Sequence, residues 1–331
     1  MSSKHASSHH PGYKFPTEDR ISTLETKKGY TIYSVFDGHS GQQCVNLVSN
    51  TLPHRIVMAL DKKESPSPQD ISDILTEEFS KLEAECNDTL TIWSGGSTAV
   101  VSVVTDTHII TAHIGDSPAI LFSKDGILLH STSDHDSKNS SEVARVTSEG
   151  GWFSDTNVYG ENRLFNALAV TRSFGNLAKK SYEKGLNAIP DISIWERTPE
   201  SYLILCSDSF TEKIIDSPKG DKDMYGNIQK MIANRGSHQD IINHIHPILV
   251  EQDYNIESTA HLAVHQQTMK FYNYQYGKFC GDNTSLILVD LNCVQNTNLE
   301  TSISSESSNE HDNPESDAQN TSCETSCEKN L

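Results

Sequence analysis

The stretch Tyr33-Ser-Val-Phe-Asp-Gly-His-Ser-Gly41 places an acid, a glycine and a histidine at the end of an apolar run. β-Branched and aromatic residues fill Tyr30–Phe36, which predicts a strand. An Asp-Gly pair after a strand is an ordinary turn signal, so this stretch alone indicates only a turn. A chemical role for Asp37 would require further acids at the ends of other strands.

Composition narrows the class of protein. The 331 residues contain no apolar run long enough for a membrane span, and no signal-peptide core, N-terminal myristoylation site or C-terminal prenylation motif is evident. Seven cysteines without a Cys-x-x-Cys pair disfavour a zinc site and a disulfide framework. We therefore expect a reduced, intracellular chain in the cytoplasm or the nucleus. A net charge of −19 disfavours nucleic acid and anionic membranes as partners.

Three segments differ in character. We expect residues 1–12 to be a flexible N-terminus and residues 13–294 to form one folded domain. From Gln295 onward, eight acids and one lysine accompany many Ser, Thr and Asn residues and no aromatic residue, so residues 295–331 are predicted to be a disordered tail. Ser307, Thr321 and Thr325 each precede a glutamate by three residues, a pattern that acidophilic kinases recognise, so such a kinase is an expected partner.

Helical periodicity appears in several segments of the domain. Apolar residues step by three or four over Gln42–Leu60, where Pro53 should kink or divide the helix. A second amphipathic helix should begin with Asp70 as its cap. The other predicted helices are Ser141–Glu149, Tyr225–Arg235, Gln239–Glu251 and Glu257–Phe271.

Strand-like segments form a second group. Four short β-rich runs separated by Gly-Asp and Asp-Gly turns predict an antiparallel meander over Thr98–Thr105, Ile109–Ile114, Ala119–Ser123 and Ile127–His130. Two further runs, Tyr202–Cys206 and Thr284–Asp290, are apolar enough to be buried strands. Together the strands and helices predict an α+β fold of packed sheets flanked by helices.

Acids do stand at the ends of other strands. They are Glu18, Asp19, Asp37, Asp208 and Asp282. Layered sheets could bring these strand ends together, and carboxylates without His or Cys ligands favour Mg²⁺ or Mn²⁺. Two such ions can activate a water and hold a phosphoryl group. His39, two residues after Asp37, is placed to protonate a leaving oxygen.

Each acid also has an ordinary structural explanation when it is considered alone. Glu18 and Asp19 could be solvated charges, Asp208 could cap a short helix, and Asp282 could belong to a turn. The side chain of Asp116 is expected to form a hydrogen bond with the backbone of its own turn. Glu142 and Arg145 stand at i and i+3 and could simply pair on a helix.

The order of the motifs resembles that of the PPM-type metal-dependent Ser/Thr protein phosphatases, the protein phosphatase 2C family. The matching segments run from about Tyr13 to Asp290. They are TED (Thr17–Asp19), VFDGHSG (Val35–Gly41), GGSTAVVSVV (Gly95–Val104), AHIGDSPAIL (Ala112–Leu121), SDHDSKNSSEVARVTSEGG (Ser133–Gly151), NALAVTRSFGN (Asn166–Asn176), LCSDSF (Leu205–Phe210) and GDNTSLILV (Gly281–Val289).

The resemblance implies a fold, a site and a substrate. The fold would be a central antiparallel β-sandwich between helices, in four α-β-β-α layers, with two Mg²⁺ or Mn²⁺ ions at one end. Asp37 would bridge both ions, the Gly38 carbonyl would serve one ion, and Asp208 and Asp282 the other.

The resemblance also implies roles for the remaining motif residues. Glu18 and Asp19 would act nearby, partly through water, and His39 would be the general acid. A metal-activated water would hydrolyse phosphoserine and phosphothreonine in proteins, and the chain would be a monomer.

Several positions depart from the family pattern. Lys14 replaces the phosphate-binding arginine and loses its bidentate fork. Ser209 replaces a glycine beside Asp208 and would be strained if the backbone there had positive φ. Trp93 replaces an acid of a third, weaker metal position, which makes that position doubtful, and Asn176 replaces an aspartate. Pro118 replaces an arginine after Gly-Asp-Ser.

These departures leave three functions open. An active metal-dependent protein phosphatase is favoured by the intact acids Asp37, Asp208 and Asp282. A pseudophosphatase that acts as a regulatory adaptor for a kinase or another signalling protein is favoured by the replaced residues. A hydrolase of small phosphoesters is the third hypothesis. Turnover of a phosphopeptide with and without Mn²⁺ separates the first two.

Overall fold

The computed structural model describes residues 5–12, 16–158, 161–216, 230–270, 272–273, 278–279 and 282–294. Lys14 and residues 295–331 lie outside the described residues, so the expectations for that side chain and for the tail remain predictions.

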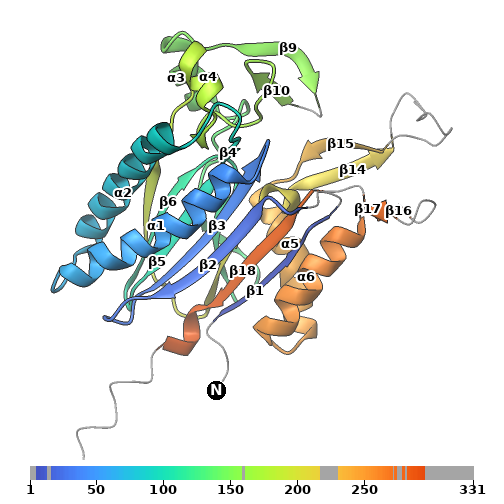
Figure 1. Ribbon diagram of the computed structural model, residues 1–331. Coiled ribbons are helices and arrows are strands. Elements are labelled where there is room, and N and C mark those ends of the chain that lie inside the picture. The colour runs from blue at the N-terminus through green and yellow to red at the C-terminus, as the bar shows by residue number, and fades with distance from the viewer. Residues whose placement is uncertain are drawn as a thin grey trace, which may run out of the picture. The chain divides into compact units, whose positions relative to one another are not determined.

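Two antiparallel sheets form the centre of the described residues (Figure 1). The first sheet has the order β11-β4-β3-β5-β6-β12, and β2 pairs with β3. Its strands are β2 (Asp19–Glu25), β3 (Thr31–His39), β4 (Gly96–Ser97), β5 (Ala99–Val104), β6 (His108–Ile114), β11 (Phe174–Gly175) and β12 (Asp191–Glu196).

The second sheet has the order β1-β18-β13-β7-β8. Its strands are β1 (His5–His10), β7 (Ala119–Ser123), β8 (Leu128–Ser131), β13 (Ser201–Cys206) and β18 (Thr284–Asp290). Short two-stranded sheets join β9 (Phe153–Val158) to β10 (Glu161–Leu164), β14 (Glu212–Asp216) to β15 (Lys230–Arg235) and β16 (Tyr272–Asn273) to β17 (Lys278–Phe279).

Helices cover the outer faces of both large sheets (Figure 1). Helices α1 (Gln43–Lys62) and α2 (Pro68–Thr89) pack on the first sheet, and α5 (His238–Glu251) and α6 (Ile256–Lys270) pack on the second. The shorter elements are α3 (Ser140–Ser148), α4 (Leu177–Tyr182) and the 3₁₀ turns η1 (Asp208–Phe210) and η2 (Leu291–Val294). The expected four layers, α-β-β-α, are confirmed. No helix in the described part of the chain is long and apolar enough to cross a membrane.

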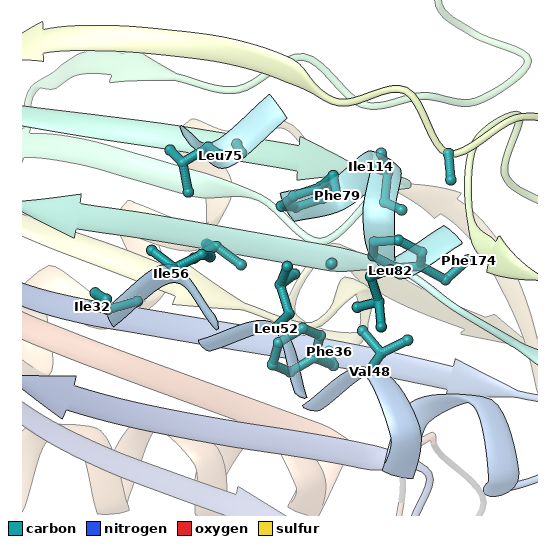
Figure 2. Packing of buried hydrophobic residues seen from close by; sticks show 14 of the residues in the cluster. Ile32, Phe36, Val48, Leu52, Ile56, Leu75, Phe79, Leu82, Ile114 and Phe174 are labelled. Atoms are coloured by element: carbon teal, nitrogen blue, oxygen red, sulfur yellow. The ribbon is translucent and has the colours of Figure 1, made fainter. Parts of the chain in front are cut away.

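Strand β3 shows why the sheets stack in this way, because both of its faces are apolar. Ile32 and Phe36 point toward α1 and α2, where Phe79 of α2 joins them in the outer core (Figure 2). Tyr33 and Val35, at the alternate positions, belong to the core between the two sheets. A strand with two buried faces reads as a nearly continuous apolar run, which is what the sequence displays at this point.

Two local expectations are wrong, and one of the two outcomes expected at Pro53 is excluded. The four central runs do not form one meander, because β5 pairs with β6 in one sheet and β7 pairs with β8 in the other. Pro53 lies inside the single helix α1, which is not divided. Helix α2 is capped by Ser67, whose hydroxyl accepts from the Asp70 N–H while the Asp70 carboxylate accepts from the Ser67 N–H, so Asp70 is the third helical residue and not the cap.

Two further expectations are corrected by strand pairing. Within the predicted helix Tyr225–Arg235, the described part Lys230–Arg235 is strand β15. The N-terminus is not flexible over His5–His10, which pairs along its whole length with β18 as an edge strand. Ala6 is buried in the core beneath α5 and α6, so this segment is part of the domain.

The N-terminal strand supplies the first testable prediction. Deleting residues 1–10 removes the edge strand beside β18 and exposes apolar surface of β18 and α6. We expect the melting temperature to fall by at least about 5 °C, since roughly 2 kcal/mol lost from a domain of this size shifts it by that amount. Thermal unfolding followed by circular dichroism measures the change.

The matched control is a chain truncated after Gln295, which we expect to unfold at the temperature of the full chain and to keep its activity. An N-terminal deletion that leaves the melting temperature unchanged would contradict the contribution assigned to β1.

Candidate active site

Two of the acids face each other across neighbouring strands. In the pairing of β2 with β3, Asp19 stands opposite Asp37. The Asp37 N–H donates to the Thr98 hydroxyl at 3.1 Å, and the Thr98 N–H donates to the Asp37 carbonyl at 2.9 Å. The strand backbone is thereby fixed on both sides of the acid.

The second sheet brings two more acids to the same end. Asp208 follows β13 and Asp282 precedes β18, and these strands are antiparallel neighbours with Cys206 opposite Leu286. The end of one strand and the beginning of the other therefore meet at one edge. The Ser285 hydroxyl donates to Oδ2 of Asp19 at 2.7 Å and so joins the two sheets at this end.

Two of the grouped carboxylates, Asp19 and Asp37, have a raised pKa. Burial raises the pKa of Asp37 well above its usual value, and the charges of Asp19, Asp208, Asp282 and Asp116 raise it further. Burial raises the pKa of Asp19 from 3.8 to about 7, helped by the charges of Asp282 and Asp208 and opposed by the hydrogen bond from Ser285. Without a bound cation, keeping Asp19 and Asp37 ionised at neutral pH therefore costs free energy of folding.

A divalent cation would relieve this repulsion, and the donor set fits one. Oδ1 of Asp19 is buried and has no hydrogen-bond partner within the described residues. All the grouped side chains are oxygen donors of the kind that Mg²⁺ and Mn²⁺ prefer. Within the same described ranges, no three His, Cys, Asp or Glu side chains are already arranged to hold an ion. The chemistry thus fits a hard cation, while the ligand geometry is not preformed.

Glu18 supports the turn that follows Asp37. Its Oε1 accepts from the Gly41 N–H at 2.7 Å, and its own N–H donates to Oδ1 of Asn283 at 2.7 Å. Gly38 donates its N–H to the Glu18 carbonyl at 3.2 Å, and a Cβ on Gly38 would approach that carbonyl oxygen to 2.7 Å. Only glycine fits against Glu18 at this position, which explains the Asp-Gly pair in the opening stretch.

Arg20 holds the first acidic segment in place and was not anticipated from the sequence. Its Nη1 donates to the carbonyl oxygens of Thr17 at 2.8 Å and Asp19 at 2.7 Å, on both sides of Glu18. Its Nε and Nη2 both donate to Oδ1 of Asn46 on α1, at 3.0 and 2.7 Å. The available sequence signal was the guanidinium fork next to an acid.

His39 contacts Asn176, a residue far away in the sequence. Nδ2 of Asn176 lies 2.7 Å from Nε2 of His39 and donates to the Ser173 hydroxyl at 2.8 Å. Strand β4 brings them together, because Gly96 pairs with His39 on one side and with Gly175 on the other. A Cβ on Gly96 would overlap both the Asn176 amide and the His39 ring. The glycine of the Gly-Ser-Thr motif is therefore required by this contact.

Asp116 belongs to the acidic group as well. It is buried at 3% exposure, and its charge contributes to the raised pKa of Asp37. Sequence reasoning placed it only in a local turn, because nothing in its own motif indicates that the β6–β7 connection passes beside Asp37.

Three further residues discussed from the sequence, Ser209, Trp93 and Glu142, lie among the described residues. Ser209 is buried inside the turn η1 and is not among the residues with positive φ, so the expected backbone strain is absent. Trp93 is exposed on the loop before β4. Glu142 does pair with Arg145, at 2.8 Å, and it also binds Arg172 at 2.6 Å, so its role extends beyond one helix.

Comparison with known proteins identifies relatives. The family model described as Protein phosphatase 2C matches residues 3–246. Protein phosphatase 1L from Bos taurus is 28% identical over 204 residues, which are 58% of this chain and 55% of the relative. Probable protein phosphatase 2C 74 from Oryza sativa subsp. japonica is 28% identical over 238 residues, 66% of this chain and 57% of the relative. The chain thus spans little more than half the length of these curated relatives.

Solved structures share the fold. A serine-threonine phosphatase 2C from Toxoplasma gondii aligns with a TM-score of 0.62 and 17% identity, covering 86% of this chain and 93% of that one. A sex determining protein from C. elegans aligns with a TM-score of 0.62 and 19% identity, covering 88% of this chain and 65% of that one. At such low identity these likenesses establish the fold alone.

The raised pKa of Asp19 predicts a stabilising substitution. In EDTA, Asp19→Asn should increase the free energy of unfolding by roughly 2–4 kcal/mol above pH 7, because it removes a buried charge. Folded Asp19 keeps its proton up to about pH 7, whereas in the unfolded chain it loses the proton near 3.8. The gain should therefore grow between these pH values and vanish below pH 4.

Urea unfolding at pH 4 and pH 7.5 measures this difference. Asp106→Asn, which changes an exposed acid in the β5–β6 turn, is the control and should show no such pH dependence. A stability difference that is equal at both pH values would be evidence against a strained Asp19 carboxylate.

Arg20 predicts a second measurable effect. Arg20→Ala frees the backbone on both sides of Glu18 and should lower the free energy of unfolding by about 1–3 kcal/mol, typical for lost hydrogen bonds to a charged group. The Mn²⁺ concentration needed to raise the melting temperature should increase at the same time. Arg20→Lys should fall between the two proteins, because an ammonium cannot make all four of these hydrogen bonds. An unchanged Mn²⁺ midpoint in Arg20→Ala would refute the positioning role.

Proposed function

Because the chain belongs to the protein phosphatase 2C family, we propose that it is a metal-dependent protein phosphatase that hydrolyses phosphoserine and phosphothreonine. The observation that carries the proposal is the meeting of Asp19, Asp37, Asp208 and Asp282 at one end of the sandwich, where burial and the charges of the neighbouring acids raise the pKa of Asp19 and Asp37. Buried acids that repel one another are unfavourable for stability alone and favour a cation site.

The proposed ligands are the residues at the two strand edges. Asp37, the Gly38 carbonyl, Asp208 and Asp282 would hold two Mg²⁺ or Mn²⁺ ions, with Glu18 and Asp19 beside them. When bound, the ions supply an activated water and neutralise charge on the phosphate. Trp93 offers no ligand for a third ion.

The chain's own groups would handle the substrate. His39 would donate a proton to the leaving serine or threonine oxygen, and Lys14 would attract the phosphate as a point charge. The chain carries a net charge of −19, so binding of the phosphate would depend on these few cationic groups. The proposed partners are phosphoprotein substrates and, for the tail, an acidophilic kinase.

A second function, a regulatory adaptor with a weak or inactive site, is supported by the contact between Asn176 and His39. An amide nitrogen can only donate, so the contact makes Nε2 of His39 an acceptor and leaves this nitrogen without a proton to give. A histidine held in this form is a poorer general acid.

Hydrolysis of phosphate esters tests the proposed function. An aryl phosphate and a phosphothreonine peptide are incubated with the full chain in Mn²⁺ and in EDTA, and Asp37→Asn serves as the inactive control. We expect release of phosphate from both substrates in Mn²⁺, none in EDTA and none from the variant. If neither substrate is turned over in Mn²⁺, the adaptor function is supported instead.

Asn176 predicts how activity can be increased. Asn176→Asp places an acceptor beside Nε2 of His39 and so keeps a proton on that nitrogen, ready for the leaving oxygen. We expect kcat to rise by roughly tenfold, which corresponds to about 1.4 kcal/mol of transition-state stabilisation. Steady-state turnover of the phosphothreonine peptide in saturating Mn²⁺ measures the effect.

Asn176→Ala is the matched control, since it removes the donor without adding an acceptor, and we expect a smaller rise. A kcat that is unchanged or lower in Asn176→Asp would show that the contact does not limit proton transfer.

A further inference from the structure

An exposed tryptophan lies on the loop before β4, near the candidate active site. Trp93 is 81% exposed, and its neighbour Ile92 is 48% exposed. Of the other tryptophans, Trp195 is buried and Trp152 is 46% exposed. Aromatic side chains contribute most to stability when they are buried, so an indole that is almost fully exposed contributes little to the fold. An exposed indole beside an exposed isoleucine is available for contact with a partner, and tryptophan is enriched at such interfaces.

The loop that carries Trp93 is held rigidly. The Thr91 N–H donates to the Ser94 hydroxyl at 3.0 Å, and the Ser94 N–H donates back to the Thr91 carbonyl at 3.0 Å. The Ser94 carbonyl accepts from the Cys44 N–H at 3.1 Å, which fixes the loop to the first turn of α1. Leu90 packs against the outer core. The indole is therefore presented from an ordered turn, which limits the entropy lost on binding.

The same loop leads directly to His39. The carbonyl of Gly95 accepts from the Asn176 N–H at 2.8 Å, and a Cβ on Gly95 would overlap the His39 carbonyl. Trp93 is two residues away from Gly95, a span of at most about 7 Å along the chain. A peptide whose phosphoresidue lies at His39 would thus place a residue beside the phosphoresidue within reach of Trp93.

The charges near Trp93 favour a cation. Helix α2 ends at Thr89 with no basic residue in its last turn, so its C-terminal dipole presents partial negative charge toward the loop. Glu83 and Glu85 of this helix are paired with Lys180 and Arg55. Asp88, in the last turn of the same helix and five residues before Trp93, is exposed and makes no ion pair with the residues that the structure describes, so its charge is not neutralised by a neighbouring cation there.

We propose that Trp93 is a specificity residue that binds a lysine or arginine side chain flanking the phosphoresidue of a protein substrate. The cation lies on the face of the indole and is attracted by Asp88 and by the C-terminal end of α2. This inference rests on the proposed phosphatase function, since it assigns the substrate class of the same site.

The test compares three phosphothreonine peptides that differ only in the residues flanking the phosphothreonine, which are arginine, leucine or glutamate. An aryl phosphate, which has no flanking residue, is the fourth substrate. The proteins are the wild type, Trp93→Ala, Trp93→Phe, Asp88→Asn and, as a matched control on another surface, Trp152→Ala.

We expect Trp93→Ala to lower kcat/KM for the arginine peptide by about five- to tenfold through a higher KM, the size of an exposed to partly buried cation–π contact. Trp93→Phe should recover part of the loss, and Asp88→Asn should lose about twofold. The aryl phosphate and Trp152→Ala should be unaffected.

Three results would overturn the inference. An equal loss on the aryl phosphate would show that Trp93 acts on the site itself. An equal loss on the leucine peptide would show that charge is not recognised. An arginine peptide that Trp93→Ala hydrolyses as well as the wild type does would show that the indole is not used.

A binding measurement distinguishes failure of the proposed phosphatase function from failure of this inference. If no substrate is turned over, the anisotropy of a fluorescein-labelled arginine peptide carrying a phosphonate analogue of phosphothreonine replaces kcat/KM. Weaker binding to Trp93→Ala than to Trp152→Ala then supports the inference, and equal binding overturns it.

Discussion

Repulsion among the carboxylates grouped at one end of the sandwich is the constraint on which the site depends. Asp19 and Asp37 are opposite each other on neighbouring strands, and Asp208 and Asp282 approach from the other sheet, so burial and the neighbouring charges raise the pKa of Asp19 and Asp37. Packing elsewhere in the domain must offset the free energy that this repulsion costs. The apolar layers on both faces of the first sheet and the strand β1 along β18 supply that stabilisation. A rigidly packed domain can therefore keep these carboxylates close together, whereas in a flexible domain they would move apart.

The second feature of the site is the close approach of backbone around His39. Gly38, Gly95 and Gly96 each leave no room for a side chain, and β4 fits between β3 and β11 because of this. The close packing brings Asn176 against His39 and places the loop of Trp93 beside both. The acidic end and the exposed indole thus follow from the same arrangement of short strands, which connects the chemistry of the site to the surface that a substrate would meet.

Much of this arrangement follows from local sequence signals. The strands around Phe36, Leu203 and Ile287 are continuous apolar runs, and the helices α1, α2 and α5 have apolar residues at helical spacing. The strand-end acids alone indicated a cation site. The split of β6 and β7 between two sheets was not predictable, because a Gly-Asp turn has the same sequence in a hairpin and in a crossover. Strand β1 was missed because Ser and His are poor strand signals, and its stability comes from β18, almost the whole chain away. Arg20 and Asp116 were missed for a related reason: each acts through contacts that its own motif does not encode.

The central claim is that the grouped acids at the end of the sandwich form a binuclear cation site, and diffraction at the manganese absorption edge tests it most directly. Crystals of the full chain are soaked in Mn²⁺, and an anomalous difference map is calculated. We expect two peaks within bonding distance of Asp37, one of them shared with Asp208 and Asp282, and no peaks there in crystals of Asp37→Asn. An empty acidic end, with Mn²⁺ found only at surface groups such as His9, would contradict it.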